Sequence, residues 1–370
     1  MGLVVNRLSF RNFRNYGALD LDGLGSLTIF VGPNATGKTN IVEGIQLLTA
    51  QTSFRNPTAA QLVKEGESFA RLDAWFGDGS RELQSTLQVA EGKKKRLLNG
   101  KAKRAADLRG IMPSVAFTPD DLDLARSASS PRRSALDALG SQLSANHHRI
   151  CSDYDKALRG KNRALKDEAP QALVDSLNEV MVLVGAQLSC YRCALFNRLG
   201  EAMAAYYRDI SGGRETLRHS YTPSWEDHDP AVARTRSFSR DEARDAMAAA
   251  LAARAGEERA RHRSVIGPHA DHLDFFIDGR NAAVFGSQGQ KRALVLSFKL
   301  AETELIESML DQKPVLLLDD VMGELDAARR AALVEFVSQG IQTFVTATDL
   351  SYFNESLLGE ASVMELPFEE

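Results

Sequence analysis

The chain has 370 residues, of which 44% are hydrophobic and 25% are charged, an ordinary globular composition with room for about two or three domains. The formal net charge at pH 7 is -4, which excludes an overall basic nucleic-acid-binding chain, so DNA would have to meet a local basic patch. An odd set of three cysteines argues against a disulfide framework, and no apolar run is long enough to cross a membrane. We therefore expect a cytoplasmic protein without a membrane partner.

Strand and helix patterns alternate at the start of the chain. Residues 3–10 and 26–31 read as short strands, the second of them a continuous apolar run of the buried kind. Apolar residues recur at helical spacing over residues 38–50, directly after a loop that contains glycines. This succession of strand, loop and helix is the context that a phosphate-binding loop requires.

The loop itself matches the phosphate-binding template G-x-x-x-x-G-K-[ST] at every fixed position. Backbone N–H groups and the helix N-terminus would hold the phosphates, Lys38 would reach the β- and γ-phosphates, and Thr39 would offer its hydroxyl to Mg²⁺. A Gly-rich turn without function is the alternative, which the flanking strand and helix disfavour. We predict an ATP site formed by Gly32, Pro33, Asn34, Ala35, Thr36, Gly37, Lys38, Thr39 and Asn40.

A basic hairpin is predicted next. Residues 71–99 alternate loosely between apolar and polar positions, and Asn99-Gly100 is a tight-turn signal, which together predict an antiparallel β subdomain. Cations without an intervening acid surround this turn, and they could bind DNA phosphates without reading bases, or form only a solvated hairpin tip. The candidate DNA contacts are Lys93, Lys94, Lys95, Arg96, Lys101, Lys103 and Arg104.

The middle of the chain has a helical pattern. Residues 132–166, 171–210 and 240–261 are rich in alanine, leucine, arginine and glutamate at helical spacing, which predicts a helical insertion. Residues 211–236, which contain glycine and proline with mixed charge, are predicted as a loop within it.

Two further motifs follow the helical region. Ser287-Gln288-Gly289-Gln290 precedes a helical pattern over residues 291–309, where a serine hydroxyl and free backbone amides could bind an anion or simply cap the helix. The apolar strand 315–318 ends in Asp319 and Asp320, as a Walker B strand requires, with Asp319 directed to Mg²⁺ and Asp320 to the attacking water.

The order of these motifs resembles the ABC ATPase head, in which the signature serine and glycine of one subunit complete the nucleotide site of another. The resemblance is to the SMC branch and, within it, to the RecF family, and it extends over essentially the whole chain. It rests on FRNFRNY at 10–16, GPNATGKTN at 32–40, FTPDDL at 117–122, PRR at 131–133, GPH at 267–269, SQGQKR at 287–292 and LLLDDVMGELD at 316–326.

The resemblance implies the architecture and the assembly. The fold would be α/β, an ABC-type ATPase head with a mixed sheet and an antiparallel β subdomain, formed by residues 1–125 and 262–370 and interrupted by a helical arm at 126–261. Two heads would join on ATP, with Ser287 and Gly289 acting in trans. The residues after the Walker B strand, Glu324, Leu325 and Asp326, would form the D-loop.

The resemblance also implies the activity and the partners. A weak, DNA-stimulated ATPase would clamp DNA at single-strand/double-strand junctions or gaps and, with RecO- and RecR-like mediator proteins, help load recombinase, and slow hydrolysis would release it. The alternative is a nucleotide-gated DNA clamp in which hydrolysis is incidental. A transporter subunit is disfavoured by the basic hairpin and the helical arm between the P-loop and the signature, and a nuclease-bearing ABC protein by the short segment after the Walker B motif.

The chain departs from the family pattern in a few places. Ala270 and His272 stand where the family has arginine and aspartate after Gly-Pro-His, so a contact made by that arginine is in doubt. Asp320 stands where most ABC ATPases, rather than this family, carry a glutamate base, and it is one methylene shorter, which predicts slow hydrolysis. Thr348 is a candidate γ-phosphate sensor or a bland strand-end threonine, and Gln61 a candidate Q-loop residue or a solvent-facing helix residue.

Overall fold

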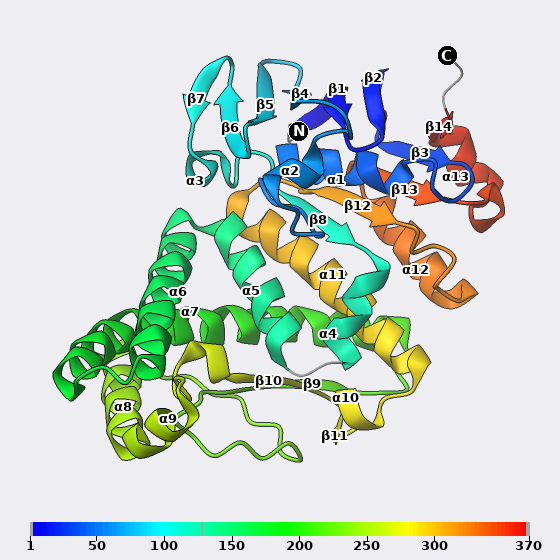
Figure 1. Cartoon of the computed structure of the whole chain (residues 1–370). Coiled ribbons are helices and arrows are strands. Elements are labelled where there is room, and N and C mark those ends of the chain that lie inside the picture. Colours follow the sequence, from blue (N-terminus) through cyan, green and yellow to red (C-terminus); the bar gives the residue numbers. More distant parts are fainter. Residues whose placement is uncertain (1–2, 127–128, 368–370) are drawn as a thin grey trace. The chain divides into compact units, whose positions relative to one another are not determined.

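The computed structural model describes residues 3–126 and 129–367, and its internal contacts divide the chain into two compact units (Figure 1). The first unit comprises residues 1–121 and 302–370, and the second comprises residues 122–301. The first unit contains the predicted P-loop and Walker B strand, and the second contains the predicted signature.

The first unit contains two sheets of different kinds. One is antiparallel, with strand order β2-β1-β4-β5-β6-β7, and the other is parallel, with order β14-β3-β13-β12-β8. Strands β3, β12 and β13 are buried along their whole length, which explains their nearly continuous apolar sequences. The strands are β1 (Val4–Phe13), β2 (Tyr16–Asp22), β3 (Leu27–Val31), β4 (Phe69–Gly77), β5 (Glu82–Ala90), β6 (Lys93–Leu98), β7 (Lys101–Lys103), β8 (Ser114–Phe117), β12 (Val315–Asp319), β13 (Thr343–Ala347) and β14 (Ser362–Glu365).

Helix α1 (Lys38–Leu48) contacts β4 and β5 of the antiparallel sheet and β12 and β13 of the parallel sheet. Its apolar residues Ile41, Val42 and Ile45 are completely buried in the core that joins the two sheets. This packing fixes the start of α1 beside the ends of β3 and β12. The other helices of this unit are α2 (Ala59–Leu62), α3 (Ala105–Leu108), α12 (Ala327–Val337) and α13 (Glu355–Glu360), with short 3-10 turns at Pro119–Leu122 and Leu350–Tyr352.

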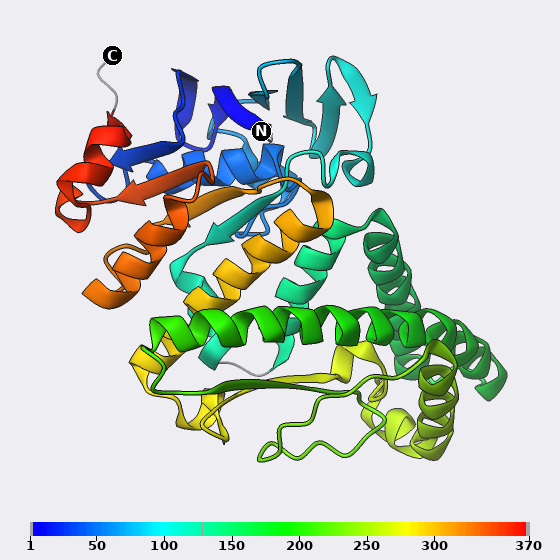
Figure 2. The ribbon, with the colours of Figure 1, turned by 180° about the vertical axis from the view of Figure 1, so that it is seen from behind.

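The second unit consists of helices packed with a three-stranded antiparallel sheet of order β11-β10-β9. The long helix α7 contacts α5, α6, α8 and β9, and Figure 2 shows it running along this sheet. The elements are α4 (Asp123–Arg126), α5 (Ser129–Leu143), α6 (Ala145–Lys166), α7 (Gln171–Ile210), β9 (Leu217–Thr222), α8 (Arg240–Ala253), α9 (Ala255–Arg261), a 3-10 turn (Pro268–Ala270), β10 (His272–Ile277), β11 (Arg280–Asn281), α10 (Ala282–Phe285) and α11 (Gln288–Leu310), which continues into the first unit.

Strand β9 corrects the prediction of an uninterrupted loop over residues 211–236. It pairs with β10 in antiparallel register from Leu217 opposite Ile277 to Thr222 opposite His272. The partner strand lies far away in the sequence, so no local turn signal reveals the pairing. By their contacts, residues 262–301 belong to the second unit, whereas the sequence analysis assigns them to the ATPase head. The functional domain boundaries remain a prediction.

Helix α7 is long and apolar enough to cross a membrane by length and composition alone. Within its most apolar window, however, 56% of the residues are buried inside the structure. Met181, Leu188 and Leu199 are among the side chains with almost no exposure. The apolar sequence of α7 is therefore explained by its place in the core of the second unit.

A buried ion pair connects α6 with α9. Lys161 Nζ lies 2.6 Å from Glu258 Oε2, and both side chains are at most 2% exposed. The other oxygen, Glu258 Oε1, accepts hydrogen bonds from the Ser264 hydroxyl (2.8 Å) and the Val265 N–H (3.0 Å). The carboxylate is therefore fully engaged, which is the condition for a charge to be tolerated in the interior.

We predict that Lys161→Met lowers the free energy of unfolding by about 3 kcal/mol, because it leaves Glu258 buried without its cation. The double variant Lys161→Met/Glu258→Leu should recover much of this loss. The matched control is Lys156→Met, which removes a solvent-exposed pair with Asp153 and should cost about 0.5 kcal/mol or less. Urea unfolding measures all three, and equal midpoints for Lys161→Met and the wild type would contradict the structural role of the pair.

Candidate functional site

Two glycines shape the loop between β3 and α1. A Cβ on Gly32 would lie 2.4 Å from the carbonyl oxygen of Leu366, and one on Gly37 would lie 2.5 Å from Asn15 Nδ2. Gly37 also has a φ of +106°, which favours glycine. The Gly32 N–H donates to the Ala347 carbonyl (3.3 Å), which ties the loop to the end of β13. Any larger residue at either glycine would move the loop.

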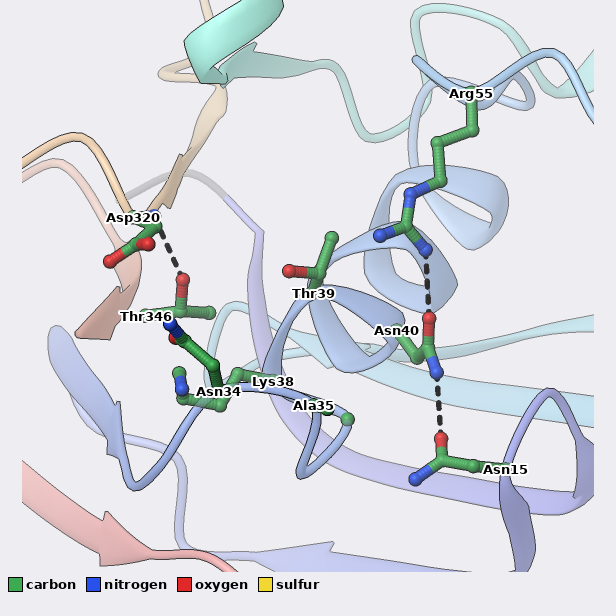
Figure 3. A pocket seen from close by; sticks show the side chains of 10 residues that line it. Asn15, Asn34, Ala35, Lys38, Thr39, Asn40, Arg55, Asp320 and Thr346 are labelled. Atoms are coloured by element: carbon green, nitrogen blue, oxygen red, sulfur yellow. Dashed lines mark hydrogen bonds between the residues drawn. The ribbon is translucent and has the colours of Figure 1, made fainter. Parts of the chain in front are cut away.

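A cavity of about 310 Å³ opens at this loop (Figure 3). It brings together side chains from the β1–β2 turn, the P-loop, the segment after α1 and the ends of β12 and β13. Predicted site residues and residues without a predicted role both contribute. The lining residues are Asn15, Asn34, Ala35, Gly37, Lys38, Thr39, Asn40, Arg55, Asp320 and Thr346.

Lys38 is held against the loop that precedes it. Its Nζ donates to the carbonyl oxygens of Gly32 (2.6 Å) and Pro33 (2.7 Å). Burial lowers the pKa of Lys38, and the negative charges of Asp320 and Asp319 oppose this effect. A phosphate that entered the cavity could replace these carbonyl acceptors, because an ammonium group binds an anionic oxygen more strongly than a neutral one.

One threonine holds both Walker B aspartates, one by its carboxylate and the other by its backbone. Thr346 Oγ1 donates to Asp319 Oδ1 (2.9 Å) and accepts a hydrogen bond from the backbone N–H of Asp320 (2.9 Å), as Figure 3 shows for Asp320. Asp320 has a φ of 55°, a left-handed conformation that is uncommon for residues other than glycine. The bond from Thr346 therefore stabilises a backbone turn that places the Asp320 side chain on the cavity wall.

The electrostatics of Asp319 are mixed. Burial raises its pKa above the ordinary value, whereas hydrogen bonds with the Thr39 and Thr346 hydroxyls and the positive charge of Arg55 lower it. Thr39 and Asp319 thus bring a hydroxyl and a carboxylate oxygen together. Hard oxygen donors of this kind suit Mg²⁺, so the residues fit the predicted metal.

Thr346 and Arg55 have no role in the sequence-based prediction. The threonine considered there, Thr348, is exposed beyond the end of β13 and does not line the cavity, whereas Thr346 is completely buried. In the sheet, Thr346 lies opposite Asp319 in the parallel pair of β13 and β12. A hydroxyl residue near the end of a buried strand is the only sequence signal for Thr346, and the order of strands is needed to use it.

Arg55 brings a second cation to the cavity. Its guanidinium donates to Asn40 Oδ1 (2.8 Å) and lies 3.5 Å from the buried carboxylate of Glu43. Arg14 binds the same carboxylate through two hydrogen bonds (2.9 and 2.8 Å), and Asn40 Nδ2 donates to Asn15 Oδ1 (2.7 Å; Figure 3). This network connects the first turns of α1 with the β1–β2 turn and the segment after α1.

Gln61 has a local structural role. The Thr58 backbone N–H donates to Gln61 Oε1 (2.8 Å), which forms a capping box at the start of α2. Gln61 does not line the cavity. This placement favours the interpretation of Gln61 as a solvent-facing helix residue over that of a Q-loop residue.

The signature residues form the N-terminus of α11 in the second unit. The helix begins at Gln288, earlier than the helical pattern predicts, and Ser287 is exposed. The Gln290 N–H donates to Ser287 Oγ (3.2 Å), and the Ser287 N–H donates to Gln290 Oε1 (2.8 Å). This is a capping box, and Gly289 lies within the first turn that it closes. A serine hydroxyl that accepts one bond can still donate its proton to a phosphate.

The predicted D-loop leads into α12. Leu325 is buried, and Asp326 is the N-cap of the helix, accepting from the Arg329 N–H (3.0 Å) and pairing with its guanidinium. Glu324 is exposed, and its backbone N–H donates to the Val321 carbonyl (3.1 Å). Asp326 therefore has a structural role whether or not it also meets a partner.

The basic hairpin is formed by β6 and β7, and the turn residues Asn99 and Gly100 both have positive φ, as its sequence predicts. Three of its seven cations bind within the chain: Lys94 to the Pro57 carbonyl (3.4 Å), Arg96 to Gln51 Oε1 (3.1 Å) and Arg104 to Asp107 (2.9 Å). The other four side chains are exposed. They are Lys93, Lys95, Lys101 and Lys103.

The segment after Gly267-Pro268 lies in the second unit and is partly buried. His269 Nδ1 lies 2.6 Å from the Tyr154 hydroxyl, and its Nε2 lies 3.2 Å from the Ser264 carbonyl oxygen. His272, one of the departures from the family pattern, stacks on His228 with ring centroids 3.8 Å apart. The other departure, Ala270, ends the short 3-10 turn before Asp271.

Comparisons with known proteins agree with this geometry. A family model described as the RecF/RecN/SMC N-terminal domain matches residues 4–363. The DNA replication and repair protein RecF of Synechococcus sp. (strain JA-3-3Ab) is 35% identical over 96% of this chain and 94% of its own length. The protein of the same description from Heliobacterium modesticaldum (strain ATCC 51547 / Ice1) is 33% identical over 98% and 97%.

Solved structures are similar over the same extent. The structure of the recombination mediator protein RecF-ATP in the RecFOR pathway has a TM-score of 0.86 and 28% identity, and it covers 95% of this chain and 94% of its own. An Smc head bound to the C-winged helix domain of ScpA has a TM-score of 0.54 at 15% identity, covering 98% and 93%. The second likeness shows the fold alone.

We predict that Thr346→Val lowers the rate of ATP turnover roughly tenfold to a hundredfold, because the Asp319 carboxylate and the backbone N–H of Asp320 both lose the hydroxyl that positions them. Nucleotide affinity should change much less, since the P-loop contacts remain. Thr346→Ser keeps the hydroxyl and should retain most of the turnover. Thr28→Val is the matched control, since Thr28 is a buried threonine of the same sheet whose hydroxyl has no hydrogen-bond partner among the residues that the structure describes. Steady-state turnover and nucleotide titration distinguish these outcomes, and equal turnover in the valine and serine variants would contradict the prediction.

Proposed function

The chain belongs to the RecF family, within the RecF/RecN/SMC class of P-loop ATPases, and on this premise we propose that it couples ATP binding and hydrolysis to the holding of DNA in recombinational repair. One observation carries the mechanism. The cavity at the P-loop is lined by the phosphate-binding loop, Asp320 and two cations, all from the first unit, whereas Ser287 and Gly289 belong to the second unit. We infer that they complete the site of a second copy of the chain.

The first step is the binding of ATP by one chain. The backbone N–H groups of residues 32–39 and the N-terminus of α1 would hold the phosphates, and Lys38 would exchange its two carbonyl acceptors for phosphate oxygens. Arg55 lines the same cavity and would add positive charge near the phosphates. Thr39 and Asp319 would hold Mg²⁺, which would neutralise part of the phosphate charge.

The second step is closure by a second copy. Ser287 is exposed at the N-terminus of a long helix, so its hydroxyl and the free amides of α11 can meet the γ-phosphate of the partner's ATP. Two such contacts, related by symmetry, would make a dimer that depends on ATP. The binding energy of the nucleotide would thus become dimerisation energy.

Hydrolysis would open the dimer. Asp320 lies on the cavity wall and would accept the proton of the attacking water. Thr346 fixes its backbone, but the aspartate is one methylene shorter than a glutamate, so its distance to the water would be longer and turnover slow. The slow step would give DNA-bound dimers a long lifetime.

DNA and mediator proteins are the proposed partners. The four exposed lysines of the hairpin support contact with the phosphate backbone, and we propose gapped DNA or junctions between single and double strands as the target. RecO- and RecR-like proteins would act with the clamp in the loading of recombinase, in the cytoplasm. The alternative, a clamp gated by nucleotide alone, predicts that Asp320→Asn, which removes the base, leaves DNA holding and release unchanged.

We predict that the wild-type chain sediments as a dimer only with ATP and Mg²⁺, and that gapped duplex DNA strengthens this dimer. Lys38→Met should not dimerise, because it no longer binds ATP. Ser287→Arg should bind ATP and yet stay monomeric. A mixture of the two variants should regain part of the turnover, because one of the two sites in the mixed dimer combines an intact P-loop with an intact signature. Monomers under every condition, or no recovery in the mixture, would exclude the shared site.

We predict that replacing Lys93, Lys95, Lys101 and Lys103 by glutamine weakens DNA binding and reduces the slope of log affinity against log salt by about 0.9 for each lost phosphate contact. The matched control carries Lys156→Gln and Lys166→Gln, which change exposed lysines of the helical region. Fluorescence anisotropy of labelled gapped duplex at several salt concentrations gives the slopes. A slope equal to that of the wild type would assign DNA contact to another surface.

A further inference from the structure

The signature glutamine is bound on both sides of its amide. Gln290 Oε1 accepts from the Ser287 N–H (2.8 Å), and Gln290 Nε2 donates to Glu215 Oε1 (2.8 Å). Glu215 lies in the turn between α7 and β9 and is distant from the signature in sequence. The capping box at Ser287 therefore has a third member that the local sequence does not contain.

Glu215 is itself held by a buried group. Its second oxygen, Oε2, accepts from the Tyr207 hydroxyl (2.7 Å), and Tyr207 is completely buried in the last turn of α7. The neighbouring Thr216 anchors the same turn, since its N–H and hydroxyl both donate to Asp278 Oδ1 (2.8 and 3.0 Å). The carboxylate thus has one position relative to α7 and the β9–β10 sheet.

We propose that Glu215 is a positioning residue for the signature, which holds Ser287 ready for the phosphate of a second copy and connects α7 to that contact. This inference rests on the proposed function, in which Ser287 acts in trans. The connection consists of Tyr207, Glu215, Gln290 and Ser287, and all four belong to the second unit.

The chemistry of the amide explains why Glu215 matters. Only one orientation of the Gln290 side chain directs its oxygen to the Ser287 N–H and its NH₂ group to the carboxylate. The flipped amide would place its oxygen against Glu215 and its NH₂ group against another donor. Without the carboxylate, one of these two penalties disappears, so the Gln290 side chain holds the serine less firmly.

Space beside Gln290 permits this loss of order. A cavity of about 400 Å³ is lined by Gln290 together with Arg280 and Phe285, and Phe285 is 66% exposed. A Gln290 side chain released from Glu215 could therefore turn into this cavity instead of capping Ser287. Side chains in close-packed surroundings lack that freedom.

The test compares Glu215→Ala with Glu215→Gln. Alanine removes both hydrogen bonds, and we expect ATP-dependent dimerisation to weaken about tenfold, since a bond to a charged group is lost from the signature. Glutamine can still accept from Gln290 and bond with Tyr207, so it should retain most of the wild-type dimerisation. The matched control Glu179→Ala, which changes an exposed acid on α7, should behave as the wild type. Binding of a fluorescent ATP analogue to single chains should be equal in all of them.

Mixing experiments separate positioning from a general loss of structure. Glu215→Ala mixed with Lys38→Met should regain turnover, because the intact P-loop of the first meets the intact signature of the second. Glu215→Ala mixed with Ser287→Arg should not regain turnover, because neither chain has an intact signature. Thermal unfolding of Glu215→Ala should stay within a few degrees of the wild type.

Each other outcome has a distinct meaning. If the wild type does not dimerise with ATP, the proposed function fails and this inference fails with it. If the wild type dimerises and Ser287→Arg does not, while Glu215→Ala dimerises as the wild type does, only the role of Glu215 is overturned. If Glu215→Ala fails in both mixtures and melts early, the residue is structural and the inference is also overturned.

Discussion

The burial of α1 between two sheets is the constraint on which the candidate ATP site depends. Nearly every residue of this helix is buried, and Gly44 permits close approach, because a Cβ there would lie 2.4 Å from the ring of Phe10. A glycine inside a helix costs about 1 kcal/mol relative to alanine, and the packing against β1 offsets that cost. The helix N-terminus is therefore held where the loop from β3 and the acids after β12 meet.

The same packing explains the charged network around Glu43. This carboxylate lies on α1 with no exposure and is satisfied by Arg14, Arg55 and the Ser53 hydroxyl. Because Arg55 also lines the cavity, an arginine of the candidate ATP site is fixed by a charge in the core. The stability of the fold and the electrostatics of the site thus depend on the same side chain.

The sequence predicts the parts of the site that are contiguous in the chain. The P-loop, the Walker B strand and the basic turn at Asn99-Gly100 each follow from a local pattern, because each is built by neighbouring residues. Thr346, Arg55 and Glu215 do not follow, because their roles depend on which strands and turns become neighbours in the fold. Strand β9 is missed for the same reason, and Lys94, Arg96 and Arg104 show that a run of charge does not reveal which members bind within the chain.

The contact between Gly32 and Leu366 has a consequence for biosynthesis. The Leu366 N–H donates to the Val31 carbonyl (2.7 Å), and its own carbonyl oxygen would lie only 2.4 Å from a Cβ on Gly32. Strand β3, which leads into the P-loop, lies between β13 and β14, both made long after it. A chain still emerging from the ribosome therefore carries the P-loop sequence without the strands that shape it. The P-loop can therefore take the conformation of the folded protein only after β13 and β14 have been made.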